Sequence, residues 1–168
     1  MKNRKKSLSL TWIGMLTALS VVGAAIKIPA IIGSVALDAF PALLASALLG
    51  GAAGPVVAGV GHLMSALLGG MPLGPLHGLI AVEMAFLAFV FSILYRSGKR
   101  WQAGALFVLG NTFAAPLPFL FLMSKAFYLS IVPSLFIGSV LNTFVAFIVI
   151  PRLARIMEPM LSKASTNE

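Results

Sequence analysis

Hydrophobic residues fill six long segments of the chain, and polar or turn-forming residues fall between them. The segments are residues 8–27, 36–51, 55–70, 77–95, 101–122 and 131–151. Most are long enough to cross a hydrocarbon core of about 30 Å as a helix, which hides its own backbone polar groups from lipid. The pattern therefore predicts an all-α integral membrane protein, with one membrane domain over residues 1–168 and a bundle of six transmembrane helices.

Glycine and proline residues mark the places where these helices should break. The second and third segments are short, and glycines and a proline within residues 50–55 join them. This spacing fits either two full crossings or one re-entrant pair. Pro116 and Pro118 fall late in the fifth segment, where they predict a kink or an early end.

Composition excludes an ordinary soluble domain, because 60% of the residues are hydrophobic, only 10% are charged, and the mean hydropathy is +1.04. The absence of cysteine excludes disulfides and thiolate chemistry. The net charge of +8 is explained by topology, because the basic residues lie at the ends of the apolar segments. With both termini in the cytoplasm, ten of the twelve basic residues share the cytoplasmic side: Lys2, Arg4, Lys5, Lys6, Arg96, Lys99, Arg100, Arg152, Arg155 and Lys163.

Four ionisable residues lie among small and apolar residues between positions 34 and 84. Asp38 fits either a cap of the second helix or a ligand contact. His62 fits either a bond to a neighbouring helix or a ligand contact, and His77 falls in an outer loop, where a histidine is usually solvated. Glu83 lies about two turns into the fourth helix, where a carboxylate needs a partner or a water-filled pocket.

Two asparagines in the later helices add hydrogen-bonding groups inside the bundle. Asn111 and Asn142 can each donate and accept there, and the commoner role of such residues is to bond helix to helix. No motif of a metalloprotease, serine hydrolase or nucleotide-binding loop is present, and His62 and His77 lack the spacing of a helical zinc site. We therefore expect a protein that is not an enzyme, and a proton-coupled carrier using Glu83 stays an alternative.

The first helix carries two small residues one turn apart, Gly14 and Ala18. Small residues four positions apart let another helix approach closely. They fit either packing inside the bundle or docking of another membrane protein.

The chain resembles the substrate-binding S component of an energy-coupling factor (ECF) vitamin transporter. The resemblance rests on the basic N-terminus, the first span TWIGMLTALSVVGAAIKIP, the six expected spans and the Gly/Pro-rich loops of residues 34–84. It implies capture of a micronutrient at the outer face of a bacterial plasma membrane. A separate membrane coupling subunit and two cytoplasmic ATPases would hydrolyse ATP, and this chain would hold no cofactor. The family's first-helix AxxxA element, which meets the coupling subunit, falls on Gly14 and Ala18.

Within that family, SVALDAFPALLASALLGG and GGMPLGPLH look most like the S components that take up alpha-ribazole for cobalamin salvage. A benzimidazole would stack on phenylalanine rings, and carboxylates would accept bonds from ribose hydroxyls. Pyridoxine-like and thiamin-precursor ligands suit the same groups. Pantothenate is less favoured, since only Lys27 and Lys125 offer positive charge in the outer loops. The substrate-binding residues expected on this basis are Asp38, Phe40, His62, His77, Glu83, Phe86, Asn111 and Phe113.

Overall fold

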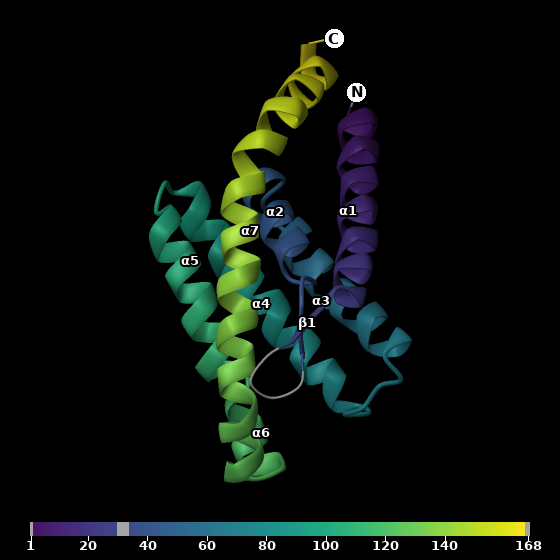
Figure 1. The fold of residues 1–168 in the computed structure, drawn as a ribbon. Coiled ribbons are helices and arrows are strands. Elements are labelled where there is room, and N and C mark those ends of the chain that lie inside the picture. Colours follow the sequence, from purple (N-terminus) through teal and green to yellow (C-terminus); the bar gives the residue numbers. More distant parts are fainter. Residues whose placement is uncertain (1, 30–33, 167–168) are drawn as a thin grey trace.

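The computed structural model describes residues 2–29 and 34–166, and these residues are almost entirely helical (Figure 1). The first half contains α1 (Lys2–Ala25), β1 (Lys27–Pro29), β2 (Ser34–Ala36), α2 (Phe40–Leu48) and α3 (Ala53–Leu68). The second half contains α4 (Leu76–Arg96), α5 (Arg100–Leu109), the π-helical turn η1 (Gly110–Ala114), α6 (Leu117–Leu122) and α7 (Lys125–Thr166). The start of α1 and the end of α7 lie at the same end of the bundle.

Four helical segments of the described chain are long and apolar enough to cross a membrane: Lys6–Ala25, Leu76–Arg96, Arg100–Leu122 and Lys125–Met157. They match the first, fourth, fifth and sixth predicted spans. The apolar helix α3 has 16 residues, and α2 has only nine. At about 1.5 Å per residue, α2 covers less than half of a hydrocarbon core of about 30 Å. A crossing helix over residues 36–51 is therefore not confirmed, and neither are six full crossings; the short α2 fits the alternative of a re-entrant pair better.

The fifth predicted span is interrupted near its prolines. The amide of Ala115 donates to the carbonyl of Gly110 at 2.8 Å, which is the wider turn of a π-helix. A regular helix resumes only after Pro116. The break in regular α-helix therefore begins one turn before the first proline, and Asn111 lies within it.

The segment between α1 and α2 forms a β-hairpin that the hydrophobic pattern did not predict. Lys27 pairs with Ala36 and Pro29 pairs with Ser34 in an antiparallel register. Strands of three residues carry too little alternation to be recognised in an apolar sequence. The pairing satisfies backbone groups that a loop near lipid would otherwise leave unbonded. Residues 30–33 of the expected outer loop lie outside the described residues, as does the side chain of Lys27.

Asn142 of α7 ties this hairpin segment to the bundle. Its Oδ1 accepts hydrogen bonds from the amides of Ala39 and Phe40, at 3.0 and 2.8 Å. Its Nδ2 donates to the carbonyls of Ala36 and Gly138, each at 2.8 Å. The prediction that an intramembrane asparagine bonds one segment to another is confirmed for Asn142, which crosslinks positions more than a hundred residues apart along the chain.

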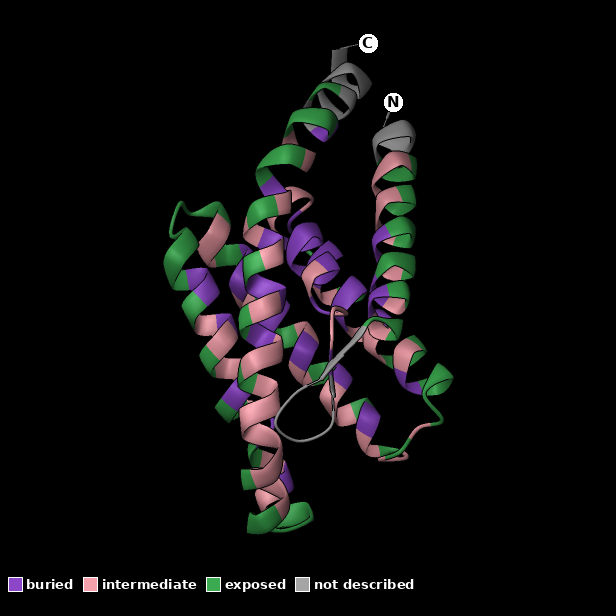
Figure 2. Ribbon diagram, in the orientation of Figure 1, coloured by how far each residue is buried: buried purple, intermediate pink, exposed green. Residues whose placement is uncertain are grey.

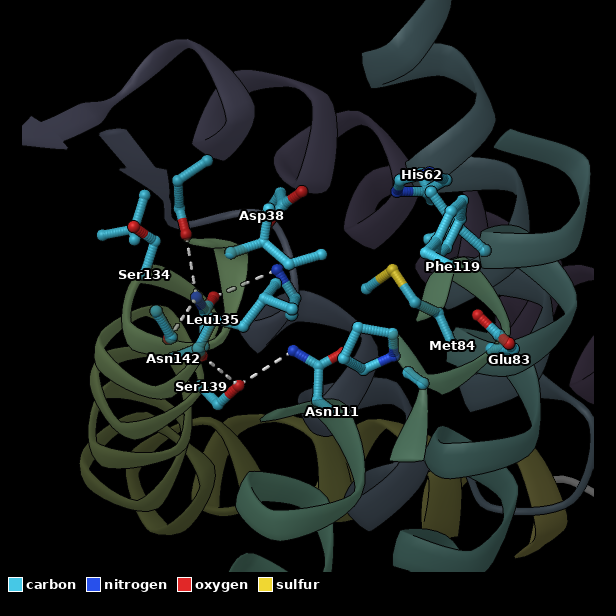
Figure 3. Close-up of a pocket in the computed structure, with 18 of the residues that line it drawn as sticks. Asp38, His62, Glu83, Met84, Asn111, Phe119, Ser134, Leu135, Ser139 and Asn142 are labelled. Atoms are coloured by element: carbon cyan, nitrogen blue, oxygen red, sulfur yellow. Dashed lines mark hydrogen bonds between the residues drawn. The ribbon is translucent and has the colours of Figure 1, made fainter. Parts of the chain in front are cut away.

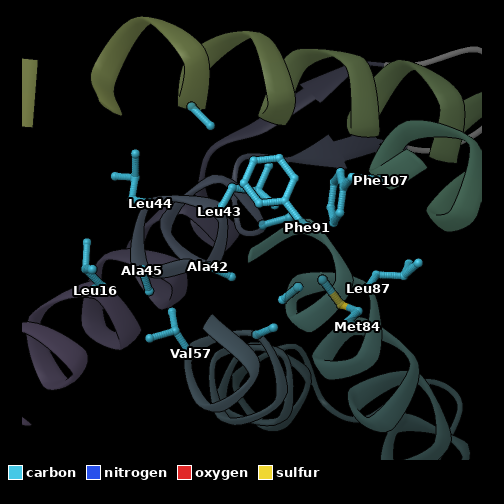
Figure 4. Close-up of a cluster of buried hydrophobic side chains, with 14 of the residues drawn as sticks. Leu16, Ala42, Leu43, Leu44, Ala45, Val57, Met84, Leu87, Phe91 and Phe107 are labelled. Atoms are coloured by element: carbon cyan, nitrogen blue, oxygen red, sulfur yellow. The ribbon is translucent and has the colours of Figure 1, made fainter. Parts of the chain in front are cut away.

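The core lies where α2 meets α3, α4 and α7, and its largest fully buried side chains include Leu43, Phe91 and Phe107 (Figure 4). Burial is concentrated on these helices, whereas most of the described part of α1 is exposed or only partly buried (Figure 2). Two serines join α2 to α4 reciprocally. Ser46 Oγ donates to the Ala88 carbonyl at 3.0 Å, and Ser92 Oγ donates to the Ser46 carbonyl at 2.9 Å.

The close approach of α2 and α3 depends on Gly54. A Cβ added there would stand 2.9 Å from the Cα of Ser46, so Gly54→Ala must push the two helices apart. We expect a loss of about 1–3 kcal/mol in the free energy of unfolding, as in other overpacked cores, measured by SDS titration in micelles with circular dichroism. Gly78→Ala is the control, because a Cβ on that helical glycine meets nothing within 4 Å. Equal stability of the two variants would contradict this packing.

Candidate functional site

A cavity of about 400 Å³ lies in the half of the bundle away from the start of α1 and the end of α7. Its walls come from the β2–α2 segment, α3, α4, η1, α6 and α7 (Figure 3). Most of the lining is apolar, with a few polar side chains that converge on the space, an arrangement typical of small-molecule sites. Those side chains include Asp38, His62, Glu83, Asn111, Ser139 and Asn142.

Two carboxylates face the cavity from different elements. Asp38 lies in the segment just before α2, and burial raises the pKa of its carboxyl group above the ordinary value. Glu83 lies on α4, and its Oε2 is buried with no hydrogen-bond partner among the described residues. No lysine or arginine of the described chain lines the cavity. The site therefore suits a ligand that donates hydrogen bonds and carries no negative charge.

Asn111 reaches the cavity from the π-helical turn. Its Nδ2 donates to Ser139 Oγ at 2.8 Å, and that hydroxyl donates to the Leu135 carbonyl at 2.6 Å. The side-chain oxygen of Asn111 makes no hydrogen bond to another described residue, so it is available to a ligand. The interruption of the fifth span therefore carries one of the polar groups of the site.

The two histidines are brought together although fifteen residues separate them. His62 Nε2 lies 3.1 Å from His77 Nδ1, and His62 lines the cavity. His77 lies in the first turn of α4 and is only 7% exposed, so the expectation of a solvated loop histidine is wrong. Its Nε2 accepts a hydrogen bond from the Leu73 amide at 3.4 Å. No group of three or more metal-ligating side chains occurs in the part of the chain that the structure describes.

The phenylalanines expected to stack on a ligand are not those that the fold brings to the cavity. Phe86 is 64% exposed and Phe113 is 47% exposed, and neither lines the cavity. Phe40 packs against the core instead. The aromatic walls are Phe119 of α6 and Phe127 of α7, whose ring centroids lie 6.0 Å apart. The sequence held no signal for this choice, because phenylalanine occurs on all sides of these apolar helices.

Gly14 and Ala18 are both exposed on α1. A Cβ added at Gly14 would meet nothing within 4 Å, whereas Leu16 and Ser20 on another side of the same helix are buried. The two small residues are therefore not used for packing inside the described chain, and they stay available to another helix.

A bundle of apolar helices around a cavity of this size and polarity is typical of membrane proteins that bind a small molecule. Residues 8–166 match the family described as "ECF transporter, substrate-specific component". The chain belongs to this family, as the sequence resemblance predicted. Its members are substrate-binding transporter subunits in the membrane and not enzymes, so a small-molecule substrate and an ECF module of coupling and ATPase subunits are implied.

The fold is also similar to a solved structure, described as "Structure and mechanism of the S component of a bacterial ECF transporter". The TM-score is 0.72 at 22% sequence identity, and the match covers 90% of this chain and 98% of that chain. At this identity the similarity shows the fold alone. None of the curated proteins matches the chain in sequence.

The unpartnered oxygen of Glu83 is expected to lower the stability of the ligand-free protein. Glu83→Leu removes a buried polar atom that has no hydrogen-bond partner among the described residues, so we expect the ligand-free protein to gain about 1–3 kcal/mol in the free energy of unfolding. SDS titration of ligand-depleted protein measures the change. Val82→Leu is the control, since Val82 is 67% exposed on the adjacent face. A Glu83→Leu protein that is less stable than this control would contradict the prediction.

Proposed function

We propose that this S component captures alpha-ribazole, the nucleoside of the cobalamin lower ligand, at the outer face of a bacterial plasma membrane. One observation carries the proposal: two carboxylates line the cavity, and no lysine or arginine of the described residues does. A neutral nucleoside donates its ribose hydroxyls to such carboxylates without bringing a negative charge near them. The resemblance of the 34–84 stretch to S components for this nucleoside supports the same choice.

The volume and lining of the cavity suit a flat ring joined to a sugar. Its volume of about 400 Å³ falls within the usual range of ligand pockets. Phe119 and Met84 lie on the same side of the cavity as Glu83 (Figure 3). In our proposal the benzimidazole packs against this apolar wall, and the ribose hydroxyls bond to Glu83 and Asp38.

Other ligands of similar chemistry remain candidates for the same cavity. A pyridoxine-like ligand or a thiamin precursor offers hydroxyl or amine donors to the two carboxylates. Pantothenate would bring a carboxylate toward Asp38 and Glu83 with no cation from the described residues to balance it. The lining therefore ranks neutral and cationic ligands above anionic ones.

The unpartnered oxygen of Glu83 favours a second candidate function, an independent carrier that couples uptake to a proton gradient. Uptake into vesicles distinguishes the two functions. An S component needs ATP and partner subunits, whereas a proton-coupled carrier works without them and loses uptake in Glu83→Gln. Membership of the S component family favours the first.

Energy for transport would come from a membrane coupling subunit and two cytoplasmic ATPases, and this chain would hold no cofactor. We propose that Gly14 and Ala18 form the docking surface for the coupling subunit, because both are exposed on α1.

We also propose that both termini of the chain lie in the cytoplasm. The turn between α4 and α5 and the C-terminal part of α7 lie in the half of the bundle that holds the start of α1 (Figure 1). These segments carry Arg96, Lys99, Arg100, Arg152 and Arg155, which supports this orientation.

Ligand binding is the direct test of the proposed substrate. We expect isothermal titration of the purified protein to give at least about 100-fold tighter binding of alpha-ribazole than of pantothenate, a difference of about 2.7 kcal/mol. Phe119→Leu should weaken alpha-ribazole binding by about 2- to 10-fold through loss of the aromatic face. Phe86→Leu is the matched control, because Phe86 lies outside the cavity. Tighter binding of pantothenate, or equal losses in the two variants, would contradict the proposal.

Docking through α1 is tested separately by co-expression with an ECF coupling subunit and its ATPases. Gly14→Leu and Ala18→Leu place bulky side chains on a surface that another helix must approach closely, so we expect each to reduce co-purification by about 10-fold or more. Met15→Leu is the control, since Met15 is exposed on the same helix but is already large. Co-purification of both variants at the level of the parent protein would rule out this surface.

A further inference from the structure

A chain of three hydrogen-bonding groups runs from the α3–α4 loop to the wall of the cavity. The amide of Leu73 donates to His77 Nε2 at 3.4 Å, and His77 Nδ1 lies 3.1 Å from His62 Nε2. Leu73 and His62 both line the cavity, whereas His77 lies buried behind them. The loop reaches this position through residues with positive φ, among them Gly70 and Gly74.

The first of these bonds determines where the protons of the two rings lie. A backbone amide can only donate, so His77 Nε2 must be the unprotonated nitrogen of that ring. The proton of neutral His77 is then on Nδ1, which donates to His62. His62 Nε2 must accept, and the proton of neutral His62 is consequently on its Nδ1. If the proton of His77 were on Nε2 instead, two N–H groups, those of His77 and Leu73, would point at each other with no acceptor between them.

His62 Nδ1 makes no hydrogen bond to another described residue. A polar N–H exposed to lipid is costly, whereas the cavity beside His62 offers room for a partner. Glu83 lies on the same side of this cavity as His62, and Asn111 and Asn142 lie across from them (Figure 3). A hydrogen-bond donor on α3 and an acceptor on α4 thus line the same cavity.

We propose that His62 Nδ1–H is a fixed hydrogen-bond donor to the substrate, held in that tautomer by His77 and the Leu73 amide. The inference rests on the proposed function of this cavity and sharpens its specificity. The substrate must carry an acceptor, such as an unprotonated aromatic nitrogen, at the His62 end and a hydroxyl or amine donor for Glu83. His77 does not touch the substrate and acts as a positioning residue.

The tautomers are measurable without any ligand. Nitrogen NMR of the full-length protein labelled with ¹⁵N-histidine should show a protonated Nδ1 and an unprotonated Nε2 for both rings. His77→Phe keeps a buried ring but removes the relay, so His62 should then populate both tautomers. His77→Asn retains a donor at the place of Nδ1 and should restore the single His62 tautomer. Protonated Nε2 on both rings of the parent protein would overturn the proposal.

Binding of alpha-ribazole tests the contact itself. The side-chain amide of asparagine lies where Nδ1 of histidine lies, whereas that of glutamine lies where Nε2 lies. His62→Gln therefore loses the donor at the Nδ1 position and should bind alpha-ribazole about 10- to 100-fold more weakly. His62→Asn keeps a donor there and should lose distinctly less affinity. A matched probe is the analogue with a carbon–hydrogen group in place of the free ring nitrogen. The parent protein should bind this analogue more weakly than it binds alpha-ribazole. The His62→Gln variant should bind the analogue and alpha-ribazole equally well. Leu63→Met, at an exposed neighbouring position, is the control.

The outcomes separate this inference from the proposed substrate. If the parent protein binds alpha-ribazole, but His62→Gln binds it equally well or the analogue shows no loss, the His62 contact is wrong and the substrate stands. If the parent protein does not bind alpha-ribazole, the substrate is wrong, and the ligand-free NMR experiment then decides for or against the histidine relay on its own.

Discussion

The rest of the structure depends on the four hydrogen bonds of Asn142. Within a bilayer no water is present to satisfy backbone groups where a chain leaves helical structure, and the amides at the start of a helix have no partner inside it. The start of α2 has no side-chain cap of its own, and Asn142 accepts from the amides of Ala39 and Phe40 instead. Because the same side chain also bonds Ala36, it positions the segment that carries Asp38 against α7.

The fold was predictable where length and hydropathy decide the outcome. Four spanning helices follow from apolar runs, and the break near Pro116 follows from a missing amide proton. The short α2 and the β-hairpin did not follow, since an apolar run does not reveal whether it crosses a membrane, turns back or pairs as strands. These choices depend on contacts with distant segments, such as the bond from Asn142 to Ala36, which no local pattern encodes.

The polar part of the site was predictable for a different reason. An ionisable group at membrane depth must face a partner or a cavity, and Asp38, His62 and Glu83 all line one. A phenylalanine side chain is equally stable facing lipid and facing the protein interior. The sequence therefore could not distinguish Phe86, which is exposed, from Phe119, which lines the cavity. The loop position expected for His77 was wrong because α4 begins one residue before it and buries its ring.

The reciprocal serine bonds between α2 and α4 have a consequence for the rate of substrate entry. Ser46 and Ser92 each donate to the partner helix, so neither helix can slide or separate without breaking two hydrogen bonds at once. We therefore expect α2 and α4 to move as one body, so that substrate entry depends on motion of the segments that connect the helices. Loop motions occur on nanosecond to microsecond timescales, whereas rearrangements of packed helices take microseconds to milliseconds. On this basis we expect the rate of ligand association to be set by the faster of these two processes.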